Sequence, residues 1–224
     1  MIDFAPLWLS LKLATLVTIL LFVIAVPIAY WLTYSKFRMK TALEVAITLP
    51  LVLPPSVLGF YLLLAFSPGN AFGKFLERFF DLRLVFTFEG LVLASVLYSL
   101  PFMVNPILAG FRSLPPSLKE ASFSFGKSAF TTLVRILLPN IATSLLTAVV
   151  MTFAHTLGEF GVVLMVGGSI PRQTRVVSIA IYDEVESMNY HSANVYAMIL
   201  LLFTFLILLG VYFINAKRRN LNLF

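Results

Sequence analysis

Long apolar runs constrain this chain more than any other feature of its sequence. Four of them, residues 7–34, 43–66, 88–111 and 194–216, are long enough to cross a membrane, because a ~30 Å hydrocarbon core needs about 20 helical residues. A fifth run, residues 133–157, carries more polar side chains, which in a span normally face other helices or a water-filled path. The sequence therefore predicts an all-α integral membrane bundle of about five spans, with run 133–157 facing its interior.

The overall composition agrees with this prediction. Of the 224 residues, 60% are hydrophobic and 12% are charged, whereas soluble domains are about half apolar and about a quarter charged. The net charge of +6 is distributed in short clusters between the apolar runs, which is typical of membrane orientation and not of nucleic-acid binding. The absence of cysteine excludes disulfides and thiolate metal sites. The first run lacks a basic leader and is longer than a signal-peptide core, so we expect it to stay in the mature protein.

Lysine and arginine in the loops predict the orientation. With the N-terminus outside, ten basic residues fall on the inner side and six on the outer side, as the positive-inside rule requires. The inner residues are Lys36, Arg38, Lys40, Arg112, Lys119, Lys127, Arg135, Lys217, Arg218 and Arg219, and the outer residues are Lys12, Lys74, Arg78, Arg83, Arg172 and Arg175. The predicted topology is N-out and C-in.

Two segments are predicted not to span. Residues 71–83 place phenylalanines at helical spacing opposite charged side chains, which favours a short helix on the outer surface. Residues 160–192 contain only a short apolar run, so we expect a re-entrant or external segment. The alternative is a sixth span over residues 160–182, but it would bury Arg172 and Arg175 at roughly 2.5–3.5 kcal/mol each.

The predicted cytoplasmic loop, residues 112–132, carries the most informative pattern. Pro115 and Pro116 allow a helix to start, Leu118, Ser122 and Phe125 would share one face of it with Ala121 close by, and Gly126 permits a turn. Around these residues the sequence reads Glu120, Ala121, Ser122, then Gly126, then Ile136, Leu138 and Pro139.

This spacing resembles the loop that defines the permease subunits of ABC importers, whose pattern is Glu-Ala-Ala, three residues, Gly, nine residues, Ile-x-Leu-Pro. Ser122 is the one departure, and because serine is small we expect the helix to pack into a partner groove regardless. The resemblance implies cytoplasmic coupling helices on which two separate ABC ATPase subunits dock. Residues 69–74 come nearest to a phosphate-binding loop, but they are one residue short of it. We therefore expect no cofactor and no catalysis in this chain, with ATP and Mg²⁺ bound by the ATPase.

Further segments narrow the resemblance to permeases for sulfate, molybdate and tungstate, and among these to molybdate permeases. They are residues 49–55 with Gly59, residues 156–161 (Thr-Leu-Gly-Glu-Phe-Gly), and residues 170–175 with 180–182. The resemblance covers about residues 7–215 and implies a single type-1 ABC transmembrane domain over residues 1–224, in the inner or plasma membrane. It also implies a second copy of the chain and an external oxyanion-binding protein as partners, besides the lipid bilayer. His155-Thr156 and Asn105-Pro106 depart from the residues common in this family.

Several residues are candidates for the transport path or its gate. Pro54 and Pro55 remove backbone donors and break the second span, which would let irregular backbone line a path or would only form a packed kink. Glu159 would repel an anion, so we expect a structural contact there, with gating as the alternative. Arg172 and Arg175 could meet the anion with forked donors, or could contact a partner protein or lipid phosphate instead. The full candidate set is Pro54, Pro55, Gly158, Glu159, Gly161, Arg172, Thr174 and Arg175.

Overall, the sequence predicts the membrane subunit of an ATP-driven oxyanion importer, most simply for molybdate. Sulfate, thiosulfate or tungstate are alternative cargoes. Two readings from other classes remain open: a membrane-embedded enzyme, although the spans contain no metal-ligand cluster, Ser–His arrangement or paired carboxylates, and a passive channel.

Overall fold

The computed structural model describes residues 3–221, with side chains described up to residue 213, and this part of the chain is all-helical. The longest helices are α1 (Ala5–Tyr34), α5 (Phe88–Ser113), α9 (Ala142–Gly158) and α12 (Tyr190–Leu221). The shorter elements are α2 (Lys40–Thr48), the 3₁₀ turn η1 (Leu49–Leu51), α3 (Pro55–Phe66), α4 (Ala71–Phe80), α6 (Pro116–Ser124), α7 (Ala129–Thr132), the π-helical turn η2 (Leu133–Leu137), α8 (Leu138–Asn140), α10 (Gly161–Gly167) and α11 (Val177–Glu186).

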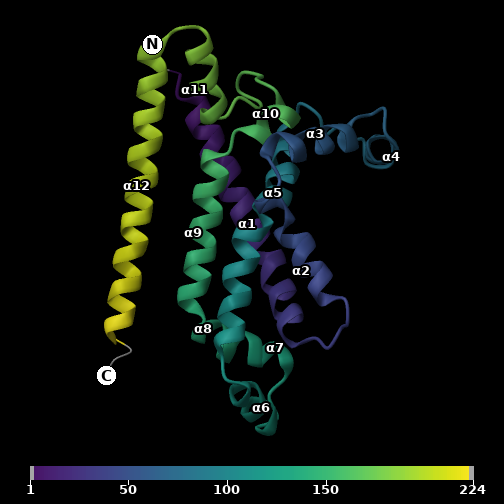
Figure 1. The fold of residues 1–224 in the computed structure, drawn as a ribbon, viewed down its shortest axis with the longest axis vertical. Coiled ribbons are helices and arrows are strands. Elements are labelled where there is room, and N and C mark those ends of the chain that lie inside the picture. Colours follow the sequence, from purple (N-terminus) through teal and green to yellow (C-terminus); the bar gives the residue numbers. More distant parts are fainter. Residues whose placement is uncertain (1–2, 222–224) are drawn as a thin grey trace.

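The long helices run roughly along one axis, so the molecule has two distinct ends (Figure 1). The N-terminus, α4, α10 and α11 lie at one end, which we call the α11 end. The loop between α1 and α2, the helices α6 to α8 and the C-terminus lie at the other, the α6 end. The predicted inner and outer loops therefore gather at opposite ends. Lys217, Arg218 and Arg219 lie outside the residues whose side chains are described.

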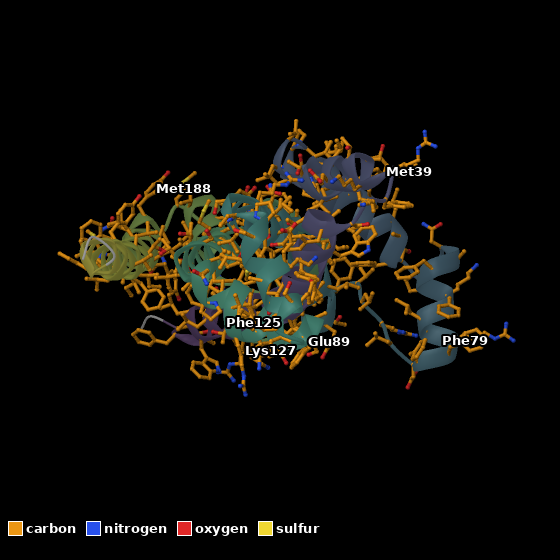
Figure 2. All side chains as sticks on the ribbon, turned by 90° about the horizontal axis from the view of Figure 1, so that it is seen from below. Met39, Phe79, Glu89, Phe125, Lys127 and Met188 are labelled. Atoms are coloured by element: carbon orange, nitrogen blue, oxygen red, sulfur yellow. The ribbon has the colours of Figure 1, made fainter. Side chains whose placement is uncertain are left out.

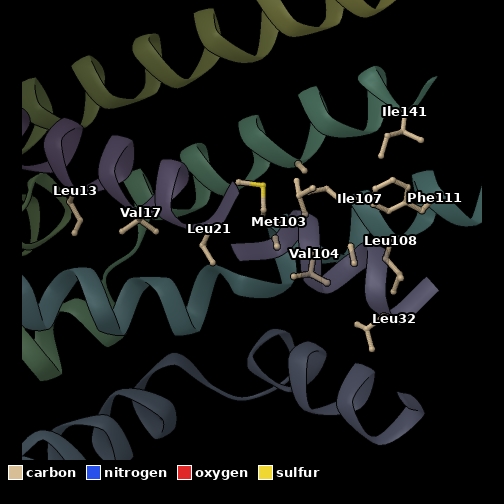
Figure 3. Packing of buried hydrophobic residues seen from close by; sticks show 14 of the residues in the cluster. Leu13, Val17, Leu21, Leu32, Met103, Val104, Ile107, Leu108, Phe111 and Ile141 are labelled. Carbon is tan, nitrogen blue, oxygen red and sulfur yellow. The ribbon is translucent and has the colours of Figure 1, made fainter. Parts of the chain in front are cut away.

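The core forms where α1, α5 and α9 pack together (Figure 3). On α1, Leu13, Val17 and Leu21 are fully buried at a spacing of four residues, which places them on one helix face. They belong to the same buried cluster as Met103 and Ile107 of α5. Ala25 and Ala29 of α1 are also fully buried, and such small residues let membrane helices approach closely.

Within the described residues, three helices are long and apolar enough to cross a membrane, and two bent pairs bring the number to five if each pair counts as one span. The second predicted span, 43–66, is one of the bent pairs: Lys40–Leu51 and Pro55–Phe66 meet at 108°. The break falls at Pro54 and Pro55, where the sequence predicted it, because prolines lack the donor that would continue the helix.

The other bent pair corrects the expected span 133–157. Ala129–Asn140 and Ala142–Gly158 meet at 80°, so the straight part begins at Ala142. Pro139 cannot donate to the carbonyl four residues earlier, and the backbone there widens into a π-helical turn in which Leu138 donates to the Leu133 carbonyl. This irregular stretch places residues 133–140 beside the loop at the α6 end.

The segments predicted not to span form short helices at the α11 end. The helix predicted over 71–83 is α4, which ends at Asp81 in a left-handed conformation, with φ of 50°. Its phenylalanines Phe75, Phe79 and Phe80 are exposed, and α4 projects from the body of the molecule (Figures 1 and 2). Residues 160–182 do not form one helix, because α10 has 7 residues and α11 has 10, and neither length crosses a bilayer.

The last helix, α12, stands almost alone beside the bundle (Figure 1). In its span window, within Tyr190–Phe213, only 6% of the residues are buried. It is attached near its beginning, where Tyr196 packs on Val177 and Ala180 and donates a 2.7 Å hydrogen bond to the Asp3 carbonyl. The remaining apolar surface of this helix requires a lipid or protein environment.

A substitution at Gly90 would test the close packing at the start of α5. A Cβ built on Gly90 would lie 1.7 Å from the Leu84 carbonyl oxygen, so Gly90→Ala must displace backbone. We expect a loss of about 1–3 kcal/mol in unfolding free energy, measured as a thermal midpoint several degrees lower in detergent. Gly210→Ala is the matched control, because a Cβ there meets nothing within 4 Å. Equal midpoints for the two variants would contradict this packing.

Candidate functional site

The loop at the α6 end is built as a helix, a turn and a second short helix. Its first helix, α6, begins at Pro116, with Pro115 in extended conformation before it, as the sequence predicted. Gly126 has a φ of 71°, a left-handed conformation that glycine adopts without steric cost. The turn then leads into α7, where the Ser128 side chain accepts from the Thr131 amide.

Ser122 corrects the predicted face of this loop. Its side chain is buried, and its hydroxyl lies 2.8 Å from that of Thr132. Phe125, predicted on the same face, is 82% exposed instead, because α6 ends at Ser124 and the turn carries Phe125 outward. Ser122 therefore holds the two short helices of the loop together and is not available to a partner groove.

The outward surface of the loop is apolar and aromatic. Phe125 and Phe130 are 82% and 74% exposed, and Glu120, Ala121 and Lys127 are exposed beside them. We call these five residues the loop face. Figure 2 looks from the α6 end and shows Phe125 and Lys127 close together on it. Exposed apolar patches of this kind occur at protein–protein and membrane interaction sites.

Two contacts tie this region to the bundle. The Lys119 ammonium of α6 lies 3.9 Å from the centre of the Tyr34 ring at the end of α1. Arg112, at the end of α5, forms a 2.6 Å ion pair with Glu44 of α2. Leu138 packs partly buried against the main core, while Pro139 is exposed. These contacts connect α6 to the end of α1 and join the end of α5 to α2.

At the α11 end, the two broken regions of the chain meet. A Cβ on Gly161 of α10 would lie 2.6 Å from Pro55 Cβ, and one on Gly59 of α3 would lie 2.9 Å from Met165 Cβ. Glycine is therefore required at both positions for α3 and α10 to pack this closely.

A cavity of about 490 Å³ opens beside this contact. It brings together four predicted path residues, and the other lining residues were not predicted as path residues. The lining residues are Pro55, Ser56, Tyr98, His155, Gly158, Glu159, Phe160 and Gly161. Ser56, Tyr98 and Phe160 come from different elements with no shared spacing, so only the assembled fold identifies them. Pro54 is not among them and instead caps α3, where its carbonyl accepts from the Val57 amide at 2.9 Å.

Hydrogen bonds fix the ring of His155 in this cavity. The Thr156 hydroxyl donates to the Thr152 carbonyl, so it can only accept from Ser99, whose hydroxyl is 3.0 Å away. Ser99 must then accept from His155 Nδ1, also at 3.0 Å. Because the ring also stacks on Phe102 at 3.8 Å, its orientation is set and Nδ1 carries the proton.

Glu159 is the acidic residue in the cavity lining, and it is only 6% exposed. Its carboxylate faces the amides of Val162 and Val163 and the Ser95 hydroxyl. Among the described residues, however, neither carboxylate oxygen has a partner in hydrogen-bond geometry. The backbone carbonyl of Glu159 accepts from the Ser178 hydroxyl, which fixes this segment to α11.

The three other predicted path residues lie apart from the cavity lining. Arg175 is paired with Asp183 at 2.9 Å and with Glu184 at 3.6 Å, so its charge is compensated inside the chain. Thr174 is buried, and its hydroxyl donates to the Gly167 carbonyl at 2.7 Å. Arg172 is exposed. Within the part of the chain searched, no three potential His, Cys, Asp or Glu ligands gather as a metal site.

Comparison with known proteins places these features in a family. Residues 12–220 match the family model described as binding-protein-dependent transport system inner membrane component. The chain is 44% identical to the molybdenum transport system permease protein ModB of Azotobacter vinelandii, over 94% of this chain and 93% of that one. It is 33% identical to a putative molybdenum transport system permease protein of Bacillus subtilis, over 97% and 94%.

A probable sulfate transport system permease protein of Nephroselmis olivacea is 30% identical over 94% of this chain and 74% of its own. Among solved structures, the MetNI methionine ABC transporter in inward-facing conformations has a chain with a TM-score of 0.70 at 17% identity, covering 93% of this chain and 92% of that one. At this identity the structural likeness concerns the fold alone.

Because Arg175 forms ion pairs and Arg172 is exposed, we expect substitutions of these two arginines to differ in their effect on the stability of the loop. Arg175→Gln removes the partner of Asp183 and Glu184, and we expect several-fold faster hydrogen exchange of the backbone over residues 168–176, since partly exposed pairs contribute up to about 1 kcal/mol. Arg172→Gln, at an exposed side chain, should leave that exchange unchanged. Similar exchange in both variants would contradict the structural role of Arg175.

Proposed function

The chain belongs to the family of binding-protein-dependent transport system inner membrane components, and from this premise we propose that it is the membrane-spanning subunit of an ATP-driven importer for an oxyanion. It is an inner-membrane protein whose relatives are transport permeases. Molybdate is the proposed cargo, because the molybdenum permease of Azotobacter vinelandii is 44% identical, whereas sulfate permeases reach 32%. Sulfate is the second candidate.

The observation that supports coupling is the loop face. It exposes aromatic side chains at one end of the molecule, and Lys119 and Arg112 connect that end to three helices of the bundle. We place this end in the cytoplasm, with the N-terminus outside and the C-terminus inside. Two ABC ATPase subunits dock there, bind ATP and Mg²⁺, and close. Their movement pulls on α1, α2 and α5, while this chain performs no covalent chemistry.

Transport requires a path, and two copies of the chain provide it between them. The α11 end then faces outward and receives the anion from an external binding protein. The cavity beside Pro55 and Gly161 lies near this outer mouth. In the proposed cycle the bundle turns from inward-open to outward-open when the ATPases close, and relaxes to release the anion inside.

The cargo can be tested directly. The complex of permease and ATPase, reconstituted into liposomes with the binding protein, should take up labelled molybdate in an ATP-dependent way, and excess unlabelled sulfate should compete poorly. Strong competition by sulfate would indicate that sulfate, and not molybdate, is the cargo. Uptake without ATP would indicate a passive channel. If the function of the chain persisted unchanged when the ATPase was omitted, an enzyme would be indicated instead of a transporter.

The coupling role predicts the effect of two loop variants. Gly126→Pro cannot adopt the φ of 71° at this position, since proline is fixed near −65°, and Glu120→Lys reverses a charge on the loop face. Both variants should insert normally but lose at least about tenfold in uptake and in retention of the ATPase on affinity purification, equivalent to ~1.4 kcal/mol of docking free energy.

The matched control is Glu186→Lys, the same charge reversal at an exposed residue of the α11 end. It should retain the ATPase fully. Normal ATPase retention and uptake in Gly126→Pro and Glu120→Lys would count against coupling through this loop.

A further inference from the structure

An apolar groove with a volume of about 540 Å³ runs between α1 and α5. Small-molecule sites occupy ~300–1,000 Å³, so the groove is large enough to hold a ligand. We propose that it binds one phospholipid with a zwitterionic headgroup. The lipid phosphate contacts Lys12, the lipid ammonium group contacts Glu89, and an acyl chain lies along the groove. This inference is independent of the cargo and of the ATPase, and it requires only that α1 and α5 cross the bilayer.

The walls of the groove are two apolar stripes, one on each helix. On α1, Leu16, Leu20 and Ile24 line the groove at a spacing of four residues, and on α5 the lining includes Val92 and Val96. Each set therefore lies on one face of its helix. Leu20 and Ile24 are 38% and 42% exposed, and the other three are half-buried. An apolar occupant would cover this surface and gain the free energy of burying it.

Each stripe begins with a charged residue at the α11 end. Lys12 precedes Leu16 by one helical turn in the α1 stripe, and Glu89 precedes Val92 in the α5 stripe. Because both helices start toward the α11 end (Figure 1), the two charges lie at the same mouth of the groove. The rest of the lining is apolar. A site with one charged end and an apolar body fits an amphiphile.

The charges also lie at the depth where lipid headgroups are found. The stretch of α5 from Glu89 to Arg112 is about 35 Å long, and that of α1 from Lys12 to Tyr34 is about 33 Å long, at 1.5 Å per residue. Both lengths cover the ~30 Å hydrocarbon core, so the mouth of the groove lies at the membrane boundary. From Lys12 to Ile24 the groove follows α1 for about 18 Å, which is close to the ~15 Å depth of one leaflet.

The two charges at the mouth select the headgroup. Among the described residues, neither Lys12 nor Glu89 forms an ion pair. The Lys12 ammonium lies 4.4 Å from the centre of the Phe88 ring, a contact that leaves its N–H groups available to a phosphate. An anionic headgroup would pair with Lys12 but would be repelled by Glu89. A headgroup with a phosphate and a primary ammonium, as in phosphatidylethanolamine, complements both residues with charge-assisted hydrogen bonds.

The experiment measures lipid retention by the purified full-length chain. The chain is incubated in detergent with equal amounts of phosphatidylethanolamine, phosphatidylcholine and phosphatidylglycerol that carry the same acyl chains, and bound lipid is counted by native mass spectrometry. The wild-type chain should retain one phosphatidylethanolamine in preference to the other two lipids. Lys12→Gln should retain it about tenfold less, because a charge-assisted contact is lost. Glu89→Gln should lose the preference over phosphatidylglycerol, because the repulsion of an anionic headgroup is removed.

Matched variants separate the groove from its surroundings. Lys74→Gln and Glu186→Gln change exposed charges of the α11 end outside the groove, and both should keep the wild-type retention and preference. Leu20→Trp places a large ring in the groove and should lower the retention of all three lipids. Ile19→Trp, at the neighbouring exposed residue outside the lining, should not lower it.

Three outcomes would overturn the inference. The first is equal retention of the three lipids by the wild-type chain, which needs no variant to fold. The second is wild-type retention and preference in both Lys12→Gln and Glu89→Gln. The third is a changed oligomeric state of Leu20→Trp with lipid retention intact, which would assign the groove to a second copy of the chain. Because neither uptake nor ATPase association is measured, failure of the proposed function would leave these results unaffected.

Discussion

Inside a bilayer, broken helix backbone is tolerated only where protein or water meets its free polar groups, and this constraint governs the structure described here. Two regions of the chain leave regular helix at the same end of the molecule: the proline break before α3 and the break between α9 and α10. Each is covered by the other, because Gly161 allows α10 to lie against Pro55 and Gly59 allows α3 to lie against Met165. The contact satisfies packing on one side and leaves the cavity on the other. A Cβ at either glycine would collide with the neighbouring helix, so both breaks depend on glycine for this contact.

The two ends of the molecule differ in how their charges are used. At the α6 end, cations contact rings and carboxylates of the bundle, as in Lys119 with Tyr34 and Arg112 with Glu44. The loop face itself combines two exposed phenylalanines with Glu120, Ala121 and Lys127. The proposed docking partner would contact the exposed Phe125 and Phe130, and the charged contacts behind them connect the α6 end to the bundle. At the α11 end, Arg175 is held by Asp183 and Glu184, and these pairs connect the loop before α11 to that helix.

The sequence was a good guide wherever one local rule decided the outcome. Apolar length predicted the helices, and the prolines at 54, 55, 115 and 116 predicted where two of them begin. It was a poor guide where the outcome depended on a distant partner. Pro139 lay inside the predicted span 133–157. Because proline has no amide proton to donate, the helix there is irregular and the expected span is bent. Ser122 was predicted to pack into the groove of a partner, but its hydroxyl is hydrogen-bonded to that of Thr132, ten residues later. Ser56 and Tyr98 share the cavity only because α3 and α5 come together, which no spacing in the sequence encodes.

The absence of a cation from the cavity lining bears on how an importer of this kind can work. A site with lysine or arginine in low dielectric would hold a doubly charged anion strongly, and strong binding in the path would slow its release. Neutral donors replace part of the hydration shell without creating a deep energy minimum. Affinity can then reside in the external binding protein, and the permease need only lower the barrier between the two sides.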